Sequence, residues 1–379
     1  MRCKIVRFVS FLLTIASLAP LAAAANQQVD SFYGPLPVFE FHSSFWVNLH
    51  HTLYFEAKQR STSPSAREDA GAAAKSNLKI TSEASAPLSP AEQRAWNEAV
   101  SYYAANFANR DLLFNNDLIL IKNQLGDFED CDELSGAKKK SCDAGLAAKL
   151  AQLLESAAPI FRAHFWPAHD RANRAWIARV APLVREQGLG LSERLADIYQ
   201  TKWPRAKIRV DASVHANWAG AYTTLDPLRV TISSIDSRNQ GAAALEVLFH
   251  EASHGIAEPV QSAILRECRQ RGKAIPRDLW HALIFYTTGE VIKPIMTETS
   301  AAQPSEAEQH NTAPIGSTSP GPSASHDLHD KGYTPYAIRE GLYQRGWNAY
   351  LQLLTRFWQP YLDGHATFDD AIARMVSAL

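Results

Sequence analysis

Two histidines and a glutamate stand in an order that can bind a metal ion and activate water. His250, Glu251 and His254 form an H-E-x-x-H motif. Residues four apart in a helix lie on the same face, so both imidazoles can bind one metal ion. Glu251 is displaced around the helix by about 100°, which takes it off the metal but within reach of a water molecule bound there. The motif therefore predicts a metal site whose water is deprotonated by a carboxylate.

The surroundings of the motif support this interpretation. With 13 histidines in 379 residues, an H-E-x-x-H arises by accident in roughly 2 of 100 such chains. The other residues between Val247 and Ile256 are uncharged, and no proline interrupts them. In these features the segment from about 228 to 290 resembles the zincins, a group of metal-dependent peptidases. The alternative is a helix that buries two histidines and an acid for structural reasons alone.

The resemblance implies one Zn²⁺ ion with three protein ligands and one open position. A metzincin would have a histidine six residues after His254, where this chain has Val260, so that branch is excluded. Gluzincins instead take a glutamate from a second helix. Glu290 is the only carboxylate in the apolar stretch 279–292, and an ionised carboxylate in such a stretch needs a cation beside it. We therefore expect Glu290 to be the third ligand.

Two other residues, His281 and Glu258, or a further carboxylate remain open as the third ligand. His281 lies nine residues before Glu290, about half a turn out of phase with it, so only one of the two can face the metal. Glu258 shares a helix face with His254 but lies one turn further along, where Pro259 suggests that the helix is ending.

The resemblance also points to supporting groups. In zincins an edge strand near the motif holds extended substrate through main-chain hydrogen bonds, and residues 229–233 are the candidate here, unless they form an ordinary sheet strand. Tyr333 and Tyr336 are candidates for stabilising the oxyanion of a tetrahedral intermediate. His50 and His51 either approach the site or occupy the polar face of an N-terminal helix.

The elements that must position these residues are mostly helical. Alternation of apolar and polar residues at 208–210 and 228–232 predicts strands of a small sheet. Helical periodicity predicts helices at 240–258, 260–271, 277–293 and over most of 336–379. The fold class is therefore α+β, predominantly helical and zincin-like, with a small sheet packed on the motif helix beside a helical lobe.

Composition divides the chain into segments. Stretches rich in Ser, Ala, Pro and Glu favour flexible segments, and Ser89-Pro90-Ala91-Glu92 is typical of a helix start. We expect a signal peptide at 1–25, an N-terminal helical segment at 26–59, a flexible linker at 60–90, a helical region at 91–204, and a catalytic region at 205–379 with a flexible insertion at 298–330.

The N-terminus and the charge balance restrict location and partners. Arg2, Lys4 and Arg7 precede an apolar stretch at 8–18 and a run of alanines at 22–25, which is typical of a secretory signal. The protein is therefore expected to be exported, periplasmic or secreted. A formal charge of −1 offers no broad basic surface for nucleic acid. No later segment is apolar for long enough to span a membrane, and the oligomeric state stays open.

The cysteines fit an oxidising compartment. Cys131 and Cys142 flank a short polar stretch and either close it by a disulfide or remain free thiols. Cys268 would then be left over as a small core residue.

Together these features predict an exported zinc-dependent hydrolase, specifically a metallopeptidase acting on a peptide or protein. Zinc would be bound by His250, His254 and Glu290, with Glu251 as the base. Two alternatives stay open: a catalytically silent zinc-binding protein on a zincin fold, and a zinc amidase acting on a non-peptide amide such as a cell-wall linkage. The motif describes attack on a carbonyl carbon and not what flanks it.

Overall fold

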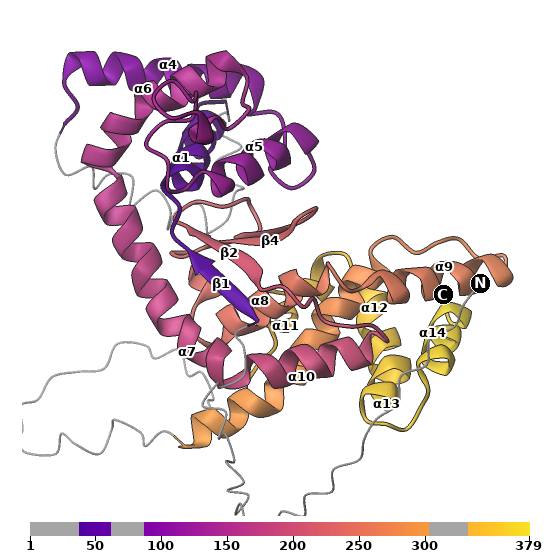
Figure 1. Ribbon diagram of the computed structural model, residues 1–379. Coiled ribbons are helices and arrows are strands. Elements are labelled where there is room, and N and C mark those ends of the chain that lie inside the picture. The colour runs from indigo at the N-terminus through magenta and orange to yellow at the C-terminus, as the bar shows by residue number, and fades with distance from the viewer. Residues whose placement is uncertain (1–37, 62–86, 303–332) are drawn as a thin grey trace, which may run out of the picture. The chain divides into compact units, whose positions relative to one another are not determined.

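The computed structural model describes residues 38–61, 87–302 and 333–379, with side chains placed up to residue 296 in the second range. The signal peptide expected at 1–25 lies outside the described residues, as do most of the linker expected at 60–90 and residues 303–330 of the insertion. Contacts gather Pro37–Leu379 into one compact unit. The described chain is mostly helical with one four-stranded sheet, which confirms the α+β class (Figure 1).

The sheet is mixed and has the strand order β1-β2-β4-β3. Its strands are β1 (Phe39–His42), β2 (Ile208–Ser213), β4 (Leu228–Ser233) and β3 (Ala221–Leu225). The first three run parallel, and β3 pairs antiparallel with β4 at the edge. β1 corrects the expectation that the N-terminal segment at 26–59 is purely helical, because Phe39 pairs with Ile208. That partner lies far along the chain, so the strand has no local sequence signal.

The helices between β1 and β2 divide between two cores. They are α1 (Phe45–Ser61), α4 (Pro90–Asn106), α5 (Asn116–Asp127), α6 (Ala148–His164) and α7 (Trp166–Ile198). Helices α1, α4, α5 and α6 bury their apolar residues in one core. Helix α7 packs into the second core, which contains the inner face of the sheet. Figure 1 shows α7 extending from the α1–α6 helices to α8 and α10.

The predicted start of α4 is confirmed in detail. The amide of Glu92 donates to Ser89 Oγ at 3.3 Å, and the amide of Ser89 donates to Glu92 Oε2 at 2.8 Å. Pro90 occupies the first helical turn, where its missing N–H costs no hydrogen bond. This capping box satisfies amides that would otherwise lack a partner.

The helices after the sheet carry the motif and surround it. They are α8 (Ala242–Ser253), α9 (Glu258–Gln270), α10 (Leu279–Ala302), α11 (Tyr336–Arg339), α12 (Asn348–Leu353), α13 (Gln359–Leu362) and α14 (Phe368–Ser377). Helix α10 continues through Pro294 beyond its predicted end at 293, and the helix predicted over 336–379 is divided into short pieces. Gly341 and Gly364, with φ of 63° and 79°, occupy turns between these pieces.

The motif helix α8 ends earlier than predicted. It stops at Ser253, and the amides of His254, Gly255 and Ile256 each donate to the carbonyl three residues back. This tight turn leads into α9. A Cβ atom on Gly255 would lie 2.6 Å from Leu228 Cδ2, so the glycine allows β4 to approach the turn closely. Helix α8 packs on β3, β4, α7 and α10 and is buried from Ala243 to Ser253.

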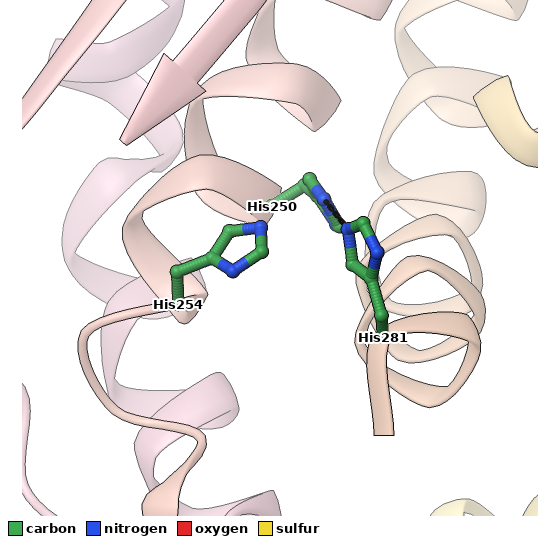
Figure 2. A group of neighbouring side chains, drawn as sticks. All are labelled: His250, His254 and His281. Atoms are coloured by element: carbon green, nitrogen blue, oxygen red, sulfur yellow. Dashed lines mark hydrogen bonds between the residues drawn. The ribbon is translucent and has the colours of Figure 1, made fainter. Parts of the chain in front are cut away.

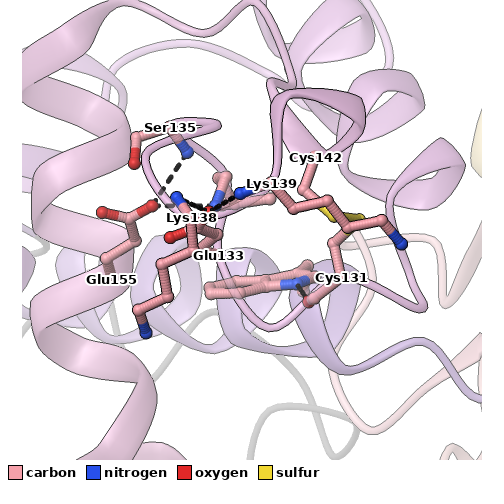
Figure 3. Close-up of a disulfide and its surroundings, with 9 residues drawn as sticks. Cys131, Glu133, Ser135, Lys138, Lys139, Cys142 and Glu155 are labelled. Carbon is pink, nitrogen blue, oxygen red and sulfur yellow. Dashed lines mark hydrogen bonds between the residues drawn. A yellow bond between two sulfur atoms is a disulfide. The ribbon is translucent and has the colours of Figure 1, made fainter.

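The loop between α5 and α6 is closed by a disulfide between Cys131 and Cys142 (Figure 3). Of the two states left open by the sequence, the structure has the bridge. Glu133 accepts hydrogen bonds from the amides of Lys138 and Lys139 inside the loop. Glu155 of α6 accepts at 2.8 Å from the amide of Ser135 and from that of the preceding residue. Two carboxylates and the disulfide therefore hold this polar loop. Cys268 is a free, buried thiol.

No helix in the described ranges 38–61, 87–302 and 333–379 is long and apolar enough to cross a membrane.

Candidate metal site

Three histidines from two helices lie close enough to bind one metal ion. His250 and His254 come from the C-terminal end of α8, and His281 comes from the first turn of α10 (Figure 2). One ligand nitrogen from each lies within 4.8 Å of the other two. The Nε2 atoms of His250 and His281 are 3.3 Å apart. The ring centroids are 5.0 Å apart for His250 and His254 and 5.0 Å apart for His254 and His281.

The helical spacing explains the first two members of this group, as the sequence predicted. The third differs from the expected one. His281 belongs to the group, and Glu290 does not. Glu290 is half-buried and lies nine residues further along α10, which is about 13 Å along a helix axis and half a turn out of phase. The structure therefore favours His281 over Glu290 as the third ligand.

Glu258 also lies outside the group. It is the first residue of α9, and its Oε1 contacts the hydroxyl of Ser262. Because α8 ends at Ser253, Glu258 is not one helical turn beyond His254 as the sequence suggested.

Burial keeps the three imidazoles neutral. The pKa of His250 is well below its usual value, because burial penalises the charged ring and because His254 and His281 are close. Burial lowers the pKa of His254 to about 3, with a further contribution from His281. Burial likewise lowers the pKa of His281 to about 4. Neutral imidazole is the form that binds a metal, so the site is ready to bind without first losing protons.

Aromatic rings surround the histidines. Trp280 packs against His254 with ring centroids 5.5 Å apart, and Trp347 packs against His281 at 5.4 Å. Phe285 stacks on His250, with ring centroids 3.4 Å apart and planes inclined by 17°. Sequence reasoning missed these neighbours, although Phe285 lies four residues after His281 in the same helix and so shares its face.

Glu251 is buried beside the histidines but is not a member of the group, as its displacement around the helix predicted. Thr223 Oγ1 on β3 lies 2.7 Å from Glu251 Oε2. Burial raises the pKa of Glu251 to about 7, although the hydrogen bond from Thr223 opposes the shift. A carboxyl group with a pKa near neutrality can exchange a proton with a reacting group at neutral pH.

The edge strand beside the motif helix is not the one that the sequence suggested. Residues 229–233 belong to β4, which pairs with β2 on one side and with β3 on the other, so its backbone has no free edge. The edge strand on the β4 side is β3, which reaches Glu251 through Thr223, and β1 forms the opposite edge. The expectation that 229–233 is the edge strand is therefore wrong, because β1 extends the sheet on the β2 side and the hairpin places β3 outside β4.

The two tyrosines proposed for oxyanion stabilisation differ in their surroundings. The hydroxyl of Tyr333 donates to Glu246 Oε2 at 2.6 Å. The ring of Tyr336 stacks on Phe285, with centroids 5.9 Å apart and planes inclined by 8°. Burial raises the pKa of Tyr336 to about 12, and the charge of Glu251 is among the smaller causes. Of the two, Tyr336 is the one whose ring packs on a neighbour of His250, whereas the Tyr333 hydroxyl is bonded to Glu246.

Sequence reasoning also missed Glu246, a buried carboxylate on α8 that lies one turn before His250. The spacing of four residues was the available signal.

His50 and His51 are not members of the histidine group. They are buried on α1, where they contact the hydroxyls of Tyr103 and Tyr222.

Comparison with known proteins gives no relative: no family model, no curated protein and no solved structure matches the chain. The resemblance to zincins therefore depends on the motif and on the geometry of the histidines and Glu251.

Proposed function

We propose that the protein is an exported zinc-dependent hydrolase that cleaves peptide bonds. One observation carries the proposal: three neutral imidazoles, from His250, His254 and His281, converge within 4.8 Å of one another beside the buried carboxyl group of Glu251. A group of three nitrogen ligands with an acid outside it is the donor set of a catalytic zinc site.

The residues fit zinc better than a hard cation. Imidazole nitrogen suits zinc and other late transition metals, whereas calcium and magnesium prefer oxygen ligands. Three protein ligands leave a fourth position for solvent or substrate. A zinc ion held there would supply Lewis acidity, acidifying water and polarising a carbonyl group.

The remaining work falls to residues of this chain. Glu251 would accept the proton of the attacking water and deliver it to the leaving amine, with Thr223 orienting its carboxylate. The hydroxyl of Tyr336 would donate a hydrogen bond to the oxyanion. The edge strand β3 would hold an extended substrate by main-chain hydrogen bonds.

The experiment that tests this function compares the wild type with Glu251→Gln on a peptide library. Glutamine has the shape of the acid but cannot accept the proton, so hydrolysis should fall by about a thousandfold or more while bound zinc stays unchanged. Glu258→Gln is the matched control, because Glu258 lies outside the site, and should retain activity.

Two other outcomes have distinct meanings. A wild type that binds zinc but cleaves no member of the library or of a panel of non-peptide amides would identify a silent metal-binding protein. Cleavage of the non-peptide amides alone would identify an amidase.

A further inference from the structure

The imidazole ring of His250 lacks the hydrogen bond that usually orients a metal-binding histidine. Its Nε2 faces His281 at 3.3 Å, so Nδ1 is the nitrogen left for support. This Nδ1 is buried and has no hydrogen-bond partner among the described residues. Histidines that bind metals nearly always donate the second ring N–H to a carboxylate, a carbonyl group or water, which fixes the ring. At Nδ1, therefore, no hydrogen bond from a described residue orients this ring.

Instead, a stack of aromatic rings packs against this imidazole. Phe285 lies flat against His250 with centroids 3.4 Å apart, and Tyr336 lies flat against Phe285 with centroids 5.9 Å apart. The three rings come from α8, α10 and α11. Planar contact of this kind restricts rotation of the imidazole about its side-chain bonds, because turning the ring would drive its edge into Phe285.

The outer ring of the stack is fixed to the motif helix itself. The amide of Tyr336 donates to Glu246 at 3.0 Å (Oε1) and 2.9 Å (Oε2), and the hydroxyl of Tyr333 donates to Oε2 at 2.6 Å. Glu246 lies one turn before His250 on α8, so the contacts that run from His250 through Phe285 and Tyr336 return to the same helix.

Close packing between α8 and α10 completes this arrangement. A Cβ atom on Gly289 of α10 would lie 2.6 Å from Pro335 Cβ and 3.1 Å from Glu246 Oε1. Only glycine lets Pro335, and with it Tyr336, approach so closely. The position of the outer ring therefore depends on contacts from two helices.

A carboxyl group buried at this position costs desolvation free energy. Glu246 is completely buried, and burial raises its pKa to about 7 despite the hydrogen bonds from Tyr333 and Tyr336. A buried acid commonly contributes less to stability than an apolar residue of the same size would. The three hydrogen bonds that Glu246 accepts come from Tyr333 and Tyr336, and so they hold the outer ring of the stack in position.

We propose that Phe285, Tyr336 and Glu246 form a positioning set for His250, in which ring stacking replaces the hydrogen bond that would otherwise orient a metal-binding histidine. This inference rests on the proposed metal site and adds residues that bind no metal themselves.

The test uses Co²⁺ bound to the full chain, because its visible absorption reports the geometry of the ligands. The central variant is Phe285→Leu, which keeps an apolar side chain but loses the flat ring. We expect Co²⁺ to bind about 10- to 100-fold more weakly, the range known for losing a supporting contact, with a changed spectrum. Phe285→Tyr should rescue both, since it retains the flat ring that stacks on His250.

Gly289→Ala tests the same positioning set by changing the packing of Pro335, which precedes Tyr336. It removes no hydrogen bond and favours helix formation, but it displaces Pro335 and should weaken Co²⁺ binding in the same direction. Phe107→Leu is the matched control, because Phe107 is a buried aromatic residue of the core around α1. It should lower stability and leave the Co²⁺ spectrum unchanged.

The outcomes separate this inference from the proposed function. Wild-type affinity and spectrum in folded Phe285→Leu and Gly289→Ala would overturn the positioning set and leave the metal site intact. If Phe285→Leu does not fold, Gly289→Ala and Phe285→Tyr decide the matter. A wild type that binds no Co²⁺ would overturn both.

Discussion

Thr223 on β3 donates a hydrogen bond to Glu251 on α8, with 2.7 Å between Oγ1 and Oε2, and the same hydroxyl lies 2.8 Å from the Glu251 carbonyl oxygen. One threonine thus joins the edge strand to the main chain and the side chain of the proposed base. Glu251 is buried, so this contact decides where its carboxylate points.

Thr223→Val tests that contact. Valine has the shape of threonine without the hydroxyl, so the fold should persist while Glu251 loses its donor. We expect kcat to fall by about tenfold with little change in KM or in metal content. Thr52→Val is the control: Thr52 is a buried threonine of α1 that bonds to Asn48, and its loss should leave kcat unchanged. A Thr223→Val enzyme with wild-type kcat would contradict the assigned role.

The disulfide should stabilise the protein without contributing to the site. Replacing Cys131 and Cys142 by serine releases a loop with a sequence separation of 11 residues. In the chain-entropy view this costs about 2–3 kcal/mol of unfolding free energy. Urea unfolding with and without dithiothreitol measures the effect: reductant should destabilise the wild type and have no effect on the double variant. Equal stability of the oxidised wild type and the variant would show that the bridge contributes nothing.

Stability in acid should depend on Glu129, which receives hydrogen bonds from His42 at 2.8 Å and from Arg209 at 2.7 Å. Partial burial alone would raise its pKa, but these hydrogen bonds and the charge of Arg209 lower it to about 2. The folded state therefore favours the ionised carboxylate. Its contribution is complete above pH 4.5 and is lost as the pH falls from 4.5 towards 2.

Glu129→Gln should accordingly lose about 1–2 kcal/mol at pH 6, a value reduced for partial exposure to solvent. Its unfolding free energy should also depend less on pH between 4.5 and 2 than that of the wild type. Glu98→Gln is the control, because Glu98 pairs with Lys149 on an exposed surface, and it should change stability by a few tenths of a kcal/mol at most. Parallel pH profiles for wild type and Glu129→Gln would argue against the ion pair.

The two histidines and the acid of the motif could be predicted from the sequence, because a spacing of four residues within one helix fixes which side chains share a face. The third ligand could not. Helical phase showed that only one of His281 and Glu290 faces the site, but choosing between them requires knowing where α10 begins and how α8 ends. The end of α8 depends on the turn at Gly255 and its contact with Leu228, which is a tertiary feature.

Most of the residues and strands that support the site could not be predicted, because they depend on contacts between distant parts of the sequence. Strand β1 forms only by pairing with β2, more than 160 residues later, so nothing local distinguishes Phe39–His42 from a helix start. The edge position of β3 follows from the order of strands in the sheet and not from its own sequence. Glu246 could have been found from its spacing of four residues before His250, whereas its partners Tyr333 and Tyr336 lie 87 and 90 residues away in the sequence.

The central claim is that His250, His254 and His281 bind one zinc ion, and metal analysis after dialysis tests it most directly. We predict one zinc ion per chain for the wild type and for Glu290→Ala, and a loss of zinc affinity of at least about a hundredfold for His281→Ala. Full zinc binding by His281→Ala, together with loss of zinc from Glu290→Ala, would contradict the account.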